Sequence, residues 1–189
     1  MDQFFEGQQY EKINFTETGL PQGSYEDCVF TNCDFSNVEL ADLKFVDCRF
    51  VNCNMSMAKL GGTVLNMISF EGCKLLGLHF EDTNQATLSL GFANCTLDHS
   101  SFYKTRMKKT SFITSRLREV DFTDCDLTLA VFDRCDLLDA RFENTVLEKA
   151  DFSGSFHFTI DPAINRVRKA KFPRDGLDGL LSKYDIEIT

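Results

Sequence analysis

The amino-acid sequence predicts an all-β fold in which short extended segments coil around one apolar core. Three observations predict it. Large apolar side chains recur at every fifth position along most of the 189 residues. A second column, two positions before the first, holds mostly small or medium side chains. Between Cys28 and Phe152 neither column contains a charged residue, so both columns are expected to face the core.

The first column, which we call position i, runs from Phe5 to Leu90 and then, two residues out of step, from Phe92 to Phe152. Gln85 is its one polar member. A period of five matches neither a helix nor a strand. Each five-residue unit must therefore contain a corner that returns the next side chain to the interior. Successive turns of such a coil stack at about 4.8 Å and join by backbone hydrogen bonds.

Composition and charge exclude several classes of protein. The chain has 20 Lys and Arg against 29 Asp and Glu, a net charge of −9 and a pI near 4.8. This charge argues against direct binding to nucleic acid or anionic lipid. No apolar run approaches the roughly eighteen residues of a membrane span, and the N-terminus lacks the segments of a secretory signal. We therefore expect a cytoplasmic protein without membrane contact.

The 8 cysteines and 3 histidines form no catalytic or metal-binding pattern. Every cysteine lies in the small column, where a free thiol packs as a small hydrophobic group, and the close cysteine pairs of zinc sites do not occur. Aspartates such as Asp34 and Asp151 recur one position before i, on solvated faces. The sequence therefore predicts no enzyme activity, no metal and no cofactor.

The repeated unit resembles that of the pentapeptide-repeat family. Clear examples are Cys33–Asn37, Cys125–Leu129 and Ala150–Gly154, in which a small residue and Asp precede Phe or Leu. The resemblance covers residues 25–155 and implies a right-handed quadrilateral β-helix with four units per turn. Cysteines spaced by twenty, as at Cys33 and Cys53, would then stack in columns. The repeats would make a rod of about six turns, roughly 30 Å long.

The chain is expected to divide into four segments. Residues 1–24 follow the five-residue repeat imperfectly and are expected to form an N-terminal cap or an imperfect first coil. Residues 25–155 form the β-helix, and the frame shift of two residues between 81 and 91 requires a bulge or small loop. Residues 156–172 make an irregular last coil with a loop, and residues 173–189 a C-terminal helical cap with a short strand.

The C-terminal segment is similar to that of the Qnr-like quinolone-resistance proteins. The similar residues are Ala170–Phe172, Leu180–Leu181 and Ile186–Ile188, the last of which we expect to form the short strand. This similarity implies a helical cap through which two rods form a homodimer, although Gly176 and Gly179 weaken the helix. The apolar residues expected in this cap or dimer contact are Leu177, Leu180, Leu181 and Tyr184.

Charge is distributed unevenly along the chain, and two clusters are candidate partner-binding residues. Residues 99–118 contain six basic residues and no acidic one, whereas residues 119–161 are strongly acidic. The basic candidates are Lys104, Arg106, Lys108, Lys109, Arg116 and Arg118. The acidic candidates are Asp121, Asp124, Asp126, Asp133, Asp136 and Asp139. The basic residues are expected either to pair with acids on neighbouring turns or to contact a partner.

These features support two functional hypotheses. In the first, a rod of outward carboxylates mimics the potential of DNA and binds DNA gyrase or another type II topoisomerase, with protection from quinolones, as the Qnr-like resemblance implies. In the second, the rod is a scaffold for an unrelated protein partner. The basic cluster and the bulge at 81–91 would then be its recognition features, although a neutral insertion also explains the bulge.

Overall fold

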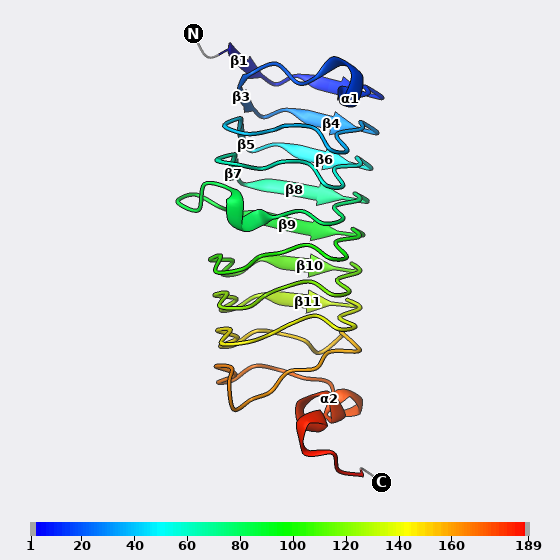
Figure 1. Cartoon of the computed structure of the whole chain (residues 1–189), viewed down its shortest axis with the longest axis vertical. Coiled ribbons are helices and arrows are strands. Elements are labelled where there is room, and N and C mark those ends of the chain that lie inside the picture. Colours follow the sequence, from blue (N-terminus) through cyan, green and yellow to red (C-terminus); the bar gives the residue numbers. More distant parts are fainter. Residues whose placement is uncertain (1–2, 188–189) are drawn as a thin grey trace.

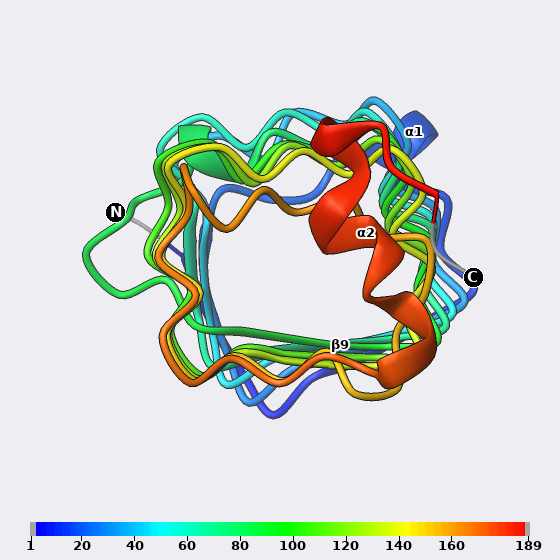
Figure 2. The same ribbon diagram turned by 90° about the horizontal axis from the view of Figure 1, so that it is seen from below.

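The computed structural model describes residues 3–187, which form an elongated rod of stacked turns (Figure 1). Viewed along the long axis, the rod has four sides around a single interior (Figure 2). All strand pairs are parallel and link one turn to the next. The prediction of an all-β, right-handed quadrilateral β-helix is therefore confirmed.

The strands form two sheets on adjacent sides of the rod. The four-stranded sheet contains β1 (Gln3–Glu6), β3 (Gly23–Glu26), β5 (Lys44–Val46) and β7 (Val64–Asn66). The seven-stranded sheet contains β2 (Gln9–Glu11), β4 (Val29–Thr31), β6 (Arg49–Val51), β8 (Ile68–Glu71), β9 (Leu90–Ala93), β10 (Ser111–Ile113) and β11 (Val131–Asp133). The other two sides are joined by isolated parallel bridges between successive turns.

We number the four sides in chain order. Face 1 carries the four-stranded sheet and, further along, the bridged residues Arg106, Asp126, Val146 and Arg166. Face 2 carries the seven-stranded sheet. Face 3 is bridged through Asn14, Asp34, Asn54, Lys74, Thr96, Arg116, Asp136 and Phe156. Face 4 is bridged through Glu39 and Lys59 and then through His79, Ser101, Asp121 and Arg141.

The register between turns changes once. Phe30 pairs with Phe50, twenty residues further along, whereas Phe70 pairs with Phe92, twenty-two residues further along. The additional residues lie after the 3-10 helix η1 (Phe80–Asp82). Residues 83–89 leave face 1 there as a small loop, which projects from the side of the rod in Figure 2. The interior columns continue unbroken below the loop.

Each corner of the rod places a residue in the left-handed region of backbone space. At most units the residue two positions after i has a positive φ, as at Asn32 (55°) and Asp47 (53°). Asn and Asp tolerate this conformation better than most residues that carry a Cβ. At many corners, such as that at Asn37, the next small-column residue donates to the carbonyl at i, as Val38 N does to Phe35 O at 3.0 Å. This is the corner that the five-residue period requires.

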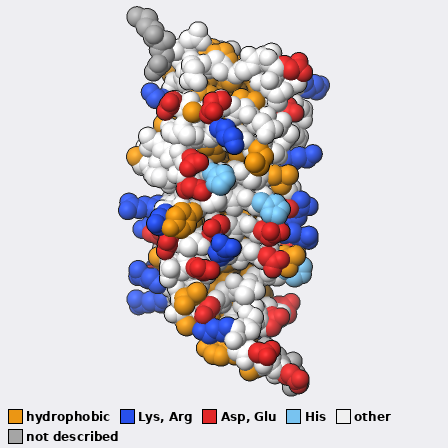
Figure 3. Space-filling view, in the orientation of Figure 1, with side chains coloured by type: hydrophobic (Ala, Val, Ile, Leu, Met, Phe, Trp, Pro, Cys, Tyr) orange, Lys and Arg blue, Asp and Glu red, His pale blue; other side chains and the backbone are white. Residues whose placement is uncertain are grey.

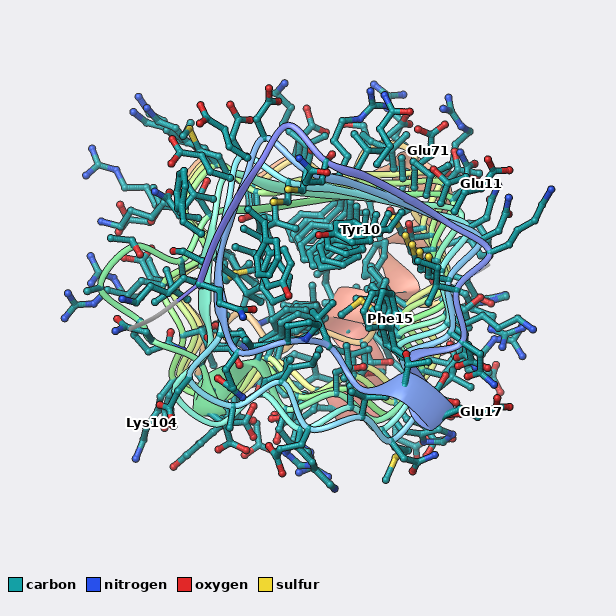
Figure 4. All side chains as sticks on the ribbon, turned by 90° about the horizontal axis from the view of Figure 1, so that it is seen from above. Tyr10, Glu11, Phe15, Glu17, Glu71 and Lys104 are labelled. Carbon is teal, nitrogen blue, oxygen red and sulfur yellow. The ribbon has the colours of Figure 1, made fainter. Side chains whose placement is uncertain are left out.

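The core consists of side chains stacked in columns along the rod (Figure 4). Behind face 2, one aromatic ring per turn stacks on the next from Tyr10 to Phe172, with centroids 4.6–5.4 Å apart. Behind face 4, a second stack runs from Phe80 to Phe142 at 4.4–5.3 Å. Stacked pairs of this kind contribute about 0.5–1.5 kcal/mol each beyond their burial. The excess of phenylalanine therefore builds the core.

All eight cysteines are buried in the small column. Their thiols lie against carbonyl oxygens of the preceding turn, as Cys53 Sγ does to Phe30 O at 3.3 Å. Burial raises the pKa of Cys48 and Cys125 to about 12 and that of Cys135 to about 11. These thiols stay protonated at neutral pH and pack as core side chains.

The N-terminal residues form a first turn of the coil. Strands β1 and β2 pair with β3 and β4 of the next turn. Helix α1 (Phe15–Thr18) forms the following side, and Asn14 caps it by accepting from Thr16 N at 3.1 Å. The buried ring of Phe15 stacks on Phe35 at 4.6 Å, so this helix joins the column of its face.

The last turn departs from the five-residue frame. Phe158 and Ile160 are buried there, while His157, which is in frame, is exposed. Helix α2 (Asp178–Leu181) covers this end of the rod (Figure 2), between the 3-10 helices η2 (Arg174–Gly176) and η3 (Ser182–Tyr184). Ile160 N donates to Gly179 O at 3.0 Å, and a Cβ at Gly179 would collide with the Phe158 carbonyl oxygen. The glycine that weakens the helix allows its close contact with the last turn.

The short strand expected over Ile186–Ile188 is not formed at Ile186 and Glu187, and Ile188 lies outside the described residues. Asp185 is left-handed, with φ of 49°, and ends the helical segment. No described strand pairs with the residues that follow it, because the end of the last turn is already covered by α2.

The inward assignment can be tested with neighbouring aromatic residues on one turn. Phe102 is fully buried, whereas the Tyr103 side chain is 37% exposed. Phe102→Asp removes a stacked ring and buries a carboxylate, so we expect it to lower the free energy of unfolding by more than about 4 kcal/mol. Tyr103→Asp, the control, should change it by less than about 1 kcal/mol. Urea unfolding followed by circular dichroism measures both, and equal midpoints would contradict the assignment.

The buried cysteines also predict a chemical behaviour. Because all eight thiols are buried and inaccessible to the reagent, native protein at pH 8 should react with DTNB only at the rate of its unfolding. All eight thiols should react at once in 6 M guanidinium. Rapid release of even one equivalent of thionitrobenzoate from native protein would show that a cysteine is not packed as described.

Candidate functional site

Function must lie on the three outward positions of each unit, because the other two fill the core. Acidic side chains concentrate on face 4 and its two corners, the side seen in Figure 3, where they are spread along the rod. We call these residues the acidic face: Glu39, Asp42, Glu81, Asp82, Glu119, Asp121, Asp124, Asp139 and Glu143. The basic residues on face 4 are fewer, namely Lys59, Lys104 and Arg141.

The backbone corners position several of these carboxylates. Asp42 and Asp124 occupy left-handed corners between faces 4 and 1, with φ of 60° and 57°. Glu119 and Asp139 occupy the corresponding corners between faces 3 and 4, with φ of 56° and 57°. Corner side chains point away from both adjoining sheets or bridges, so these carboxylates flank face 4 on both sides.

Most carboxylates of the acidic face form no ion pair with another described residue. Its ion pairs are Arg141–Asp121 at 3.8 Å, His99–Glu119 at 3.3 Å and His79–Glu81 at 3.0 Å. Glu119, Asp121, Asp139 and Arg141 line a shallow groove at the corner between faces 3 and 4. The remaining carboxylates point into solvent and produce a negative potential along this side.

The structure brings together only half of the acidic residues predicted from the sequence. Asp121, Asp124 and Asp139 belong to the acidic face. Asp126 lies on face 1, where Lys108 pairs with it at 3.1 Å, and Asp133 lies on face 2, where Arg134 pairs with it at 3.1 Å. Asp136 lies on face 3 and is buried.

Asp136 belongs to a charge network on face 3. Arg118 Nε and His157 Nδ1 lie 2.7 and 2.9 Å from its two carboxylate oxygens. Burial opposes ionisation of this carboxyl, but the hydrogen bonds from His157 and Arg118 outweigh it and lower the pKa of Asp136. Arg116 makes a similar bond to Asp98 at 2.7 Å on the same face. These residues hold neighbouring turns together.

The predicted basic residues also separate in space. Arg116 and Arg118 pair with carboxylates on face 3, and Lys108 pairs with Asp126 on face 1. Lys104 sits at the corner between faces 4 and 1 (Figure 4), with its ammonium 4.7 Å from the Tyr103 ring centroid. The other two predicted bases, Arg106 and Lys109, are exposed on face 1 and make no ion pair among residues 3–187.

Several members of the acidic face were not singled out from the sequence: Glu39, Asp42, Glu81, Asp82, Glu119 and Glu143. The signal that could have found them is the spacing of one full turn. Glu119 and Asp139 are twenty residues apart and share a corner column. A cluster of acidic residues in the sequence does not reveal such pairs, because residues close in sequence are distributed over different faces of the rod.

The other predicted features occupy separate places. The loop at 83–89 is held by Gln85, whose amide donates to Phe80 O at 2.9 Å and to Thr83 O at 3.1 Å. In the cap, Leu180 packs against the core and Leu181 is half-buried, whereas the Leu177 and Tyr184 side chains are 46% and 58% exposed. The cap therefore combines an inward residue with outward apolar ones.

No group of three His, Cys, Asp or Glu side chains within residues 3–187 could hold a metal ion. No helix among these residues is long and apolar enough to cross a membrane.

Comparison with known proteins identifies the repeat and the fold. The pentapeptide repeat region family matches residues 23–102 and 86–156, well over half of the chain. A structure of QnrB1, a plasmid-mediated fluoroquinolone resistance protein, is similar over 100% of this chain and 99% of that one, at 16% identity and a TM-score of 0.65. HetL, involved in heterocyst differentiation regulation in the cyanobacterium Nostoc sp. strain PCC 7120, is similar over 88% of this chain and 84% of that one, at 13% identity and a TM-score of 0.65. At these identities the similarity shows a shared fold. None of the curated proteins matches the sequence.

Proposed function

The chain belongs to the pentapeptide-repeat family, and on that premise we propose that it is a non-catalytic rod whose acidic face mimics DNA toward a DNA-binding protein. The observation that carries this proposal is the alignment of carboxylates on one side of the rod. Asp42, Asp82 and Asp124 follow one edge of face 4, and Glu119 and Asp139 follow the other. A DNA-binding cleft is positively charged and complementary to such a surface.

The geometry of the rod suits this role. B-DNA carries a phosphate charge every 3.4 Å or so along each strand, and turns of the rod repeat at about 4.8 Å. The carboxylates sit on a backbone that is hydrogen-bonded from turn to turn, as Asp121 N is to Ser100 O at 3.0 Å. The backbone positions of these charges are already fixed before a partner binds, so the loss of conformational entropy on binding is small.

We propose DNA gyrase or a related type II topoisomerase as the partner. The support is the full-length fold similarity to QnrB1, a fluoroquinolone resistance protein, together with the acidic face. The rod would occupy the site of the DNA gate segment and thereby inhibit the enzyme or protect it from quinolones. Both proteins would then meet in the cytoplasm, where the buried thiols stay reduced.

This function predicts a specific effect of corner charges. Asp124→Lys with Asp139→Lys reverses two charges of the acidic face, and the fold accommodates lysine at left-handed corners, as Lys104 and Lys149 show. The protein should inhibit gyrase supercoiling, or relieve its inhibition by ciprofloxacin, at low micromolar concentration. The double variant should need at least about tenfold more protein, because each reversal turns an attraction into a repulsion.

The matched control is Asp27→Lys with Asp47→Lys. These aspartates occupy left-handed corners between faces 1 and 2, away from the acidic face, and the change in net charge is the same. Activity of this control should stay within about twofold of the native protein. Equal losses in both double variants would refute a role for this face, and no response of gyrase to the native protein would refute gyrase as the partner.

A second candidate function is a scaffold for another protein partner. The mixed charges of faces 2 and 3 favour it, because pairs such as Arg118–Asp136 and Arg134–Asp133 give these faces no DNA-like potential. HetL has the same fold and a role in differentiation regulation. Cross-linking from face 3 that captures one protein other than a topoisomerase would favour this function.

We also propose that the cap joins two rods as a homodimer. Leu177 and Tyr184 expose apolar surface at the end of the rod, next to the inward-packed Leu180. Leu177→Asp should convert a dimer to a monomer in light scattering. Leu138→Asp, at a 39% exposed leucine on face 3, is the control and should leave the dimer intact. A native protein that is monomeric at 100 μM would contradict the proposal.

A further inference from the structure

The C-terminal half of face 1 has a charge opposite to that of the whole molecule. The net charge of the chain is −9, yet Lys and Arg side chains project together from the left edge of the lower rod in Figure 3. We call this surface the basic strip and define it by its exposed cations: Arg106, Lys108, Lys109, Lys149, Arg166, Arg168 and Lys169.

The coil stacks these cations in three parallel rows. Arg106 and Arg166 belong to one row of bridged residues, with Asp126 and Val146 between them. The corner row contains Lys109, Leu129, Lys149 and Lys169. Backbone bonds fix the turns that carry them, as Lys109 N donates to Thr128 O at 2.9 Å and Lys149 N to Arg168 O at 3.0 Å. The strip covers four turns, or about 14 Å.

Most cations of the strip are free of internal partners. Lys108 pairs with Asp126 at 3.1 Å and Arg166 with Glu148 at 2.7 Å. Within residues 3–187 the others make no ion pair and no side-chain hydrogen bond; they are Arg106, Lys109, Lys149, Arg168 and Lys169. Lys149, Arg168 and Lys169 line a shallow groove with Glu148. Structural pairing between turns therefore does not account for this charge.

An apolar side chain lies in the middle of the strip. Leu129 is 41% exposed and holds a left-handed φ of 63°. Asparagine, aspartate and glycine fit this corner with less strain, and leucine there leaves about two fifths of its surface in contact with solvent. Lys109 and Lys149 lie above and below it in the same corner row. A leucine framed by lysines is the surface that an acidic segment with an apolar side chain would contact.

The surroundings limit the length of the ligand. Above the strip, the loop at 83–89 projects from face 1, and beyond it the same face turns acidic at Glu26, Asp27 and Asp47. A long polyanion laid along face 1 would therefore meet the loop and then repelling carboxylates. The strip fits an extended segment of about four or five residues, because each strand residue spans about 3.3 Å.

We propose that the basic strip binds a short acidic segment of a partner protein, with an apolar side chain of that segment on Leu129. This surface lies on a different side from the acidic face and is independent of the proposed topoisomerase function. Carboxylates of the segment pair with Lys109, Lys149 and the guanidinium of Arg168. The fully ordered backbone beneath them keeps the loss of entropy on binding small.

The test uses the full chain and a fluorescein-labelled peptide of sequence Glu-Asp-Leu-Glu-Asp in fluorescence anisotropy at 50 mM salt. The native protein should bind it saturably, and Lys109→Glu with Lys149→Glu should weaken binding at least about tenfold. Glutamate is compatible with such corners, as Glu119 shows. Leu129→Asn should weaken binding about twofold to fivefold without loss of stability, because asparagine suits the left-handed corner.

The matched control is Lys12→Glu with Lys74→Glu, which changes the net charge equally at exposed sites away from the strip. Its affinity for the peptide should stay within about twofold of native. Three binding results would overturn the proposal: no saturable binding, equal losses in both double variants, or tighter binding of a twenty-nucleotide oligothymidine that the same strip reversal abolishes. A dimer that dissociates on reversal of the strip would assign the surface to a second copy and would also overturn it.

Discussion

The structure depends on the corner that closes every five-residue unit. A left-handed corner costs a residue with a Cβ about 1 kcal/mol or more, and this rod repeats it at most units. This cost is offset because each corner returns a large side chain to the apolar core. It also lets the backbone form hydrogen bonds to both the preceding and the following turn, as Asp34 N does to Ile13 O and Phe35 N does to Asn54 O. Once these demands are met, three positions of each unit are available for charge.

The sequence predicts the interior well because the interior is periodic. Residues such as Phe122 and Cys125 follow from the two columns alone, and both are fully buried. The ends are different, because they depend on contacts between segments with no common period. Burial of Phe158 in place of His157 follows from the approach of Gly179, some twenty residues later, and no pattern in the sequence encodes that approach.

The candidate site was only partly predictable for a related reason. Residues that are neighbours in sequence pass around all four sides, so Asp126, Asp133 and Asp136 end on three different faces. Residues on one face are separated by a full turn, as Glu119 and Asp139 are. Grouping them requires both the number of units per turn and the place of the two additional residues. The family resemblance implies the number of units per turn, but only the register of β8 with β9 shows where the two additional residues lie.

Charged side chains on neighbouring turns are close enough to interact, and they differ in whether they form ion pairs or stack with like charges. Turns lie about 4.8 Å apart, well within the screening length of about 8 Å at physiological salt, so like charges stacked in one column repel. Face 3 follows this rule with the pairs Arg116–Asp98 and Arg118–Asp136. The corner column of Glu119 and Asp139 breaks it, as do the stacked Lys149 and Lys169 of the basic strip. Stacked like charges oppose stability, and the partners of opposite charge proposed for these two surfaces would offset that cost on binding.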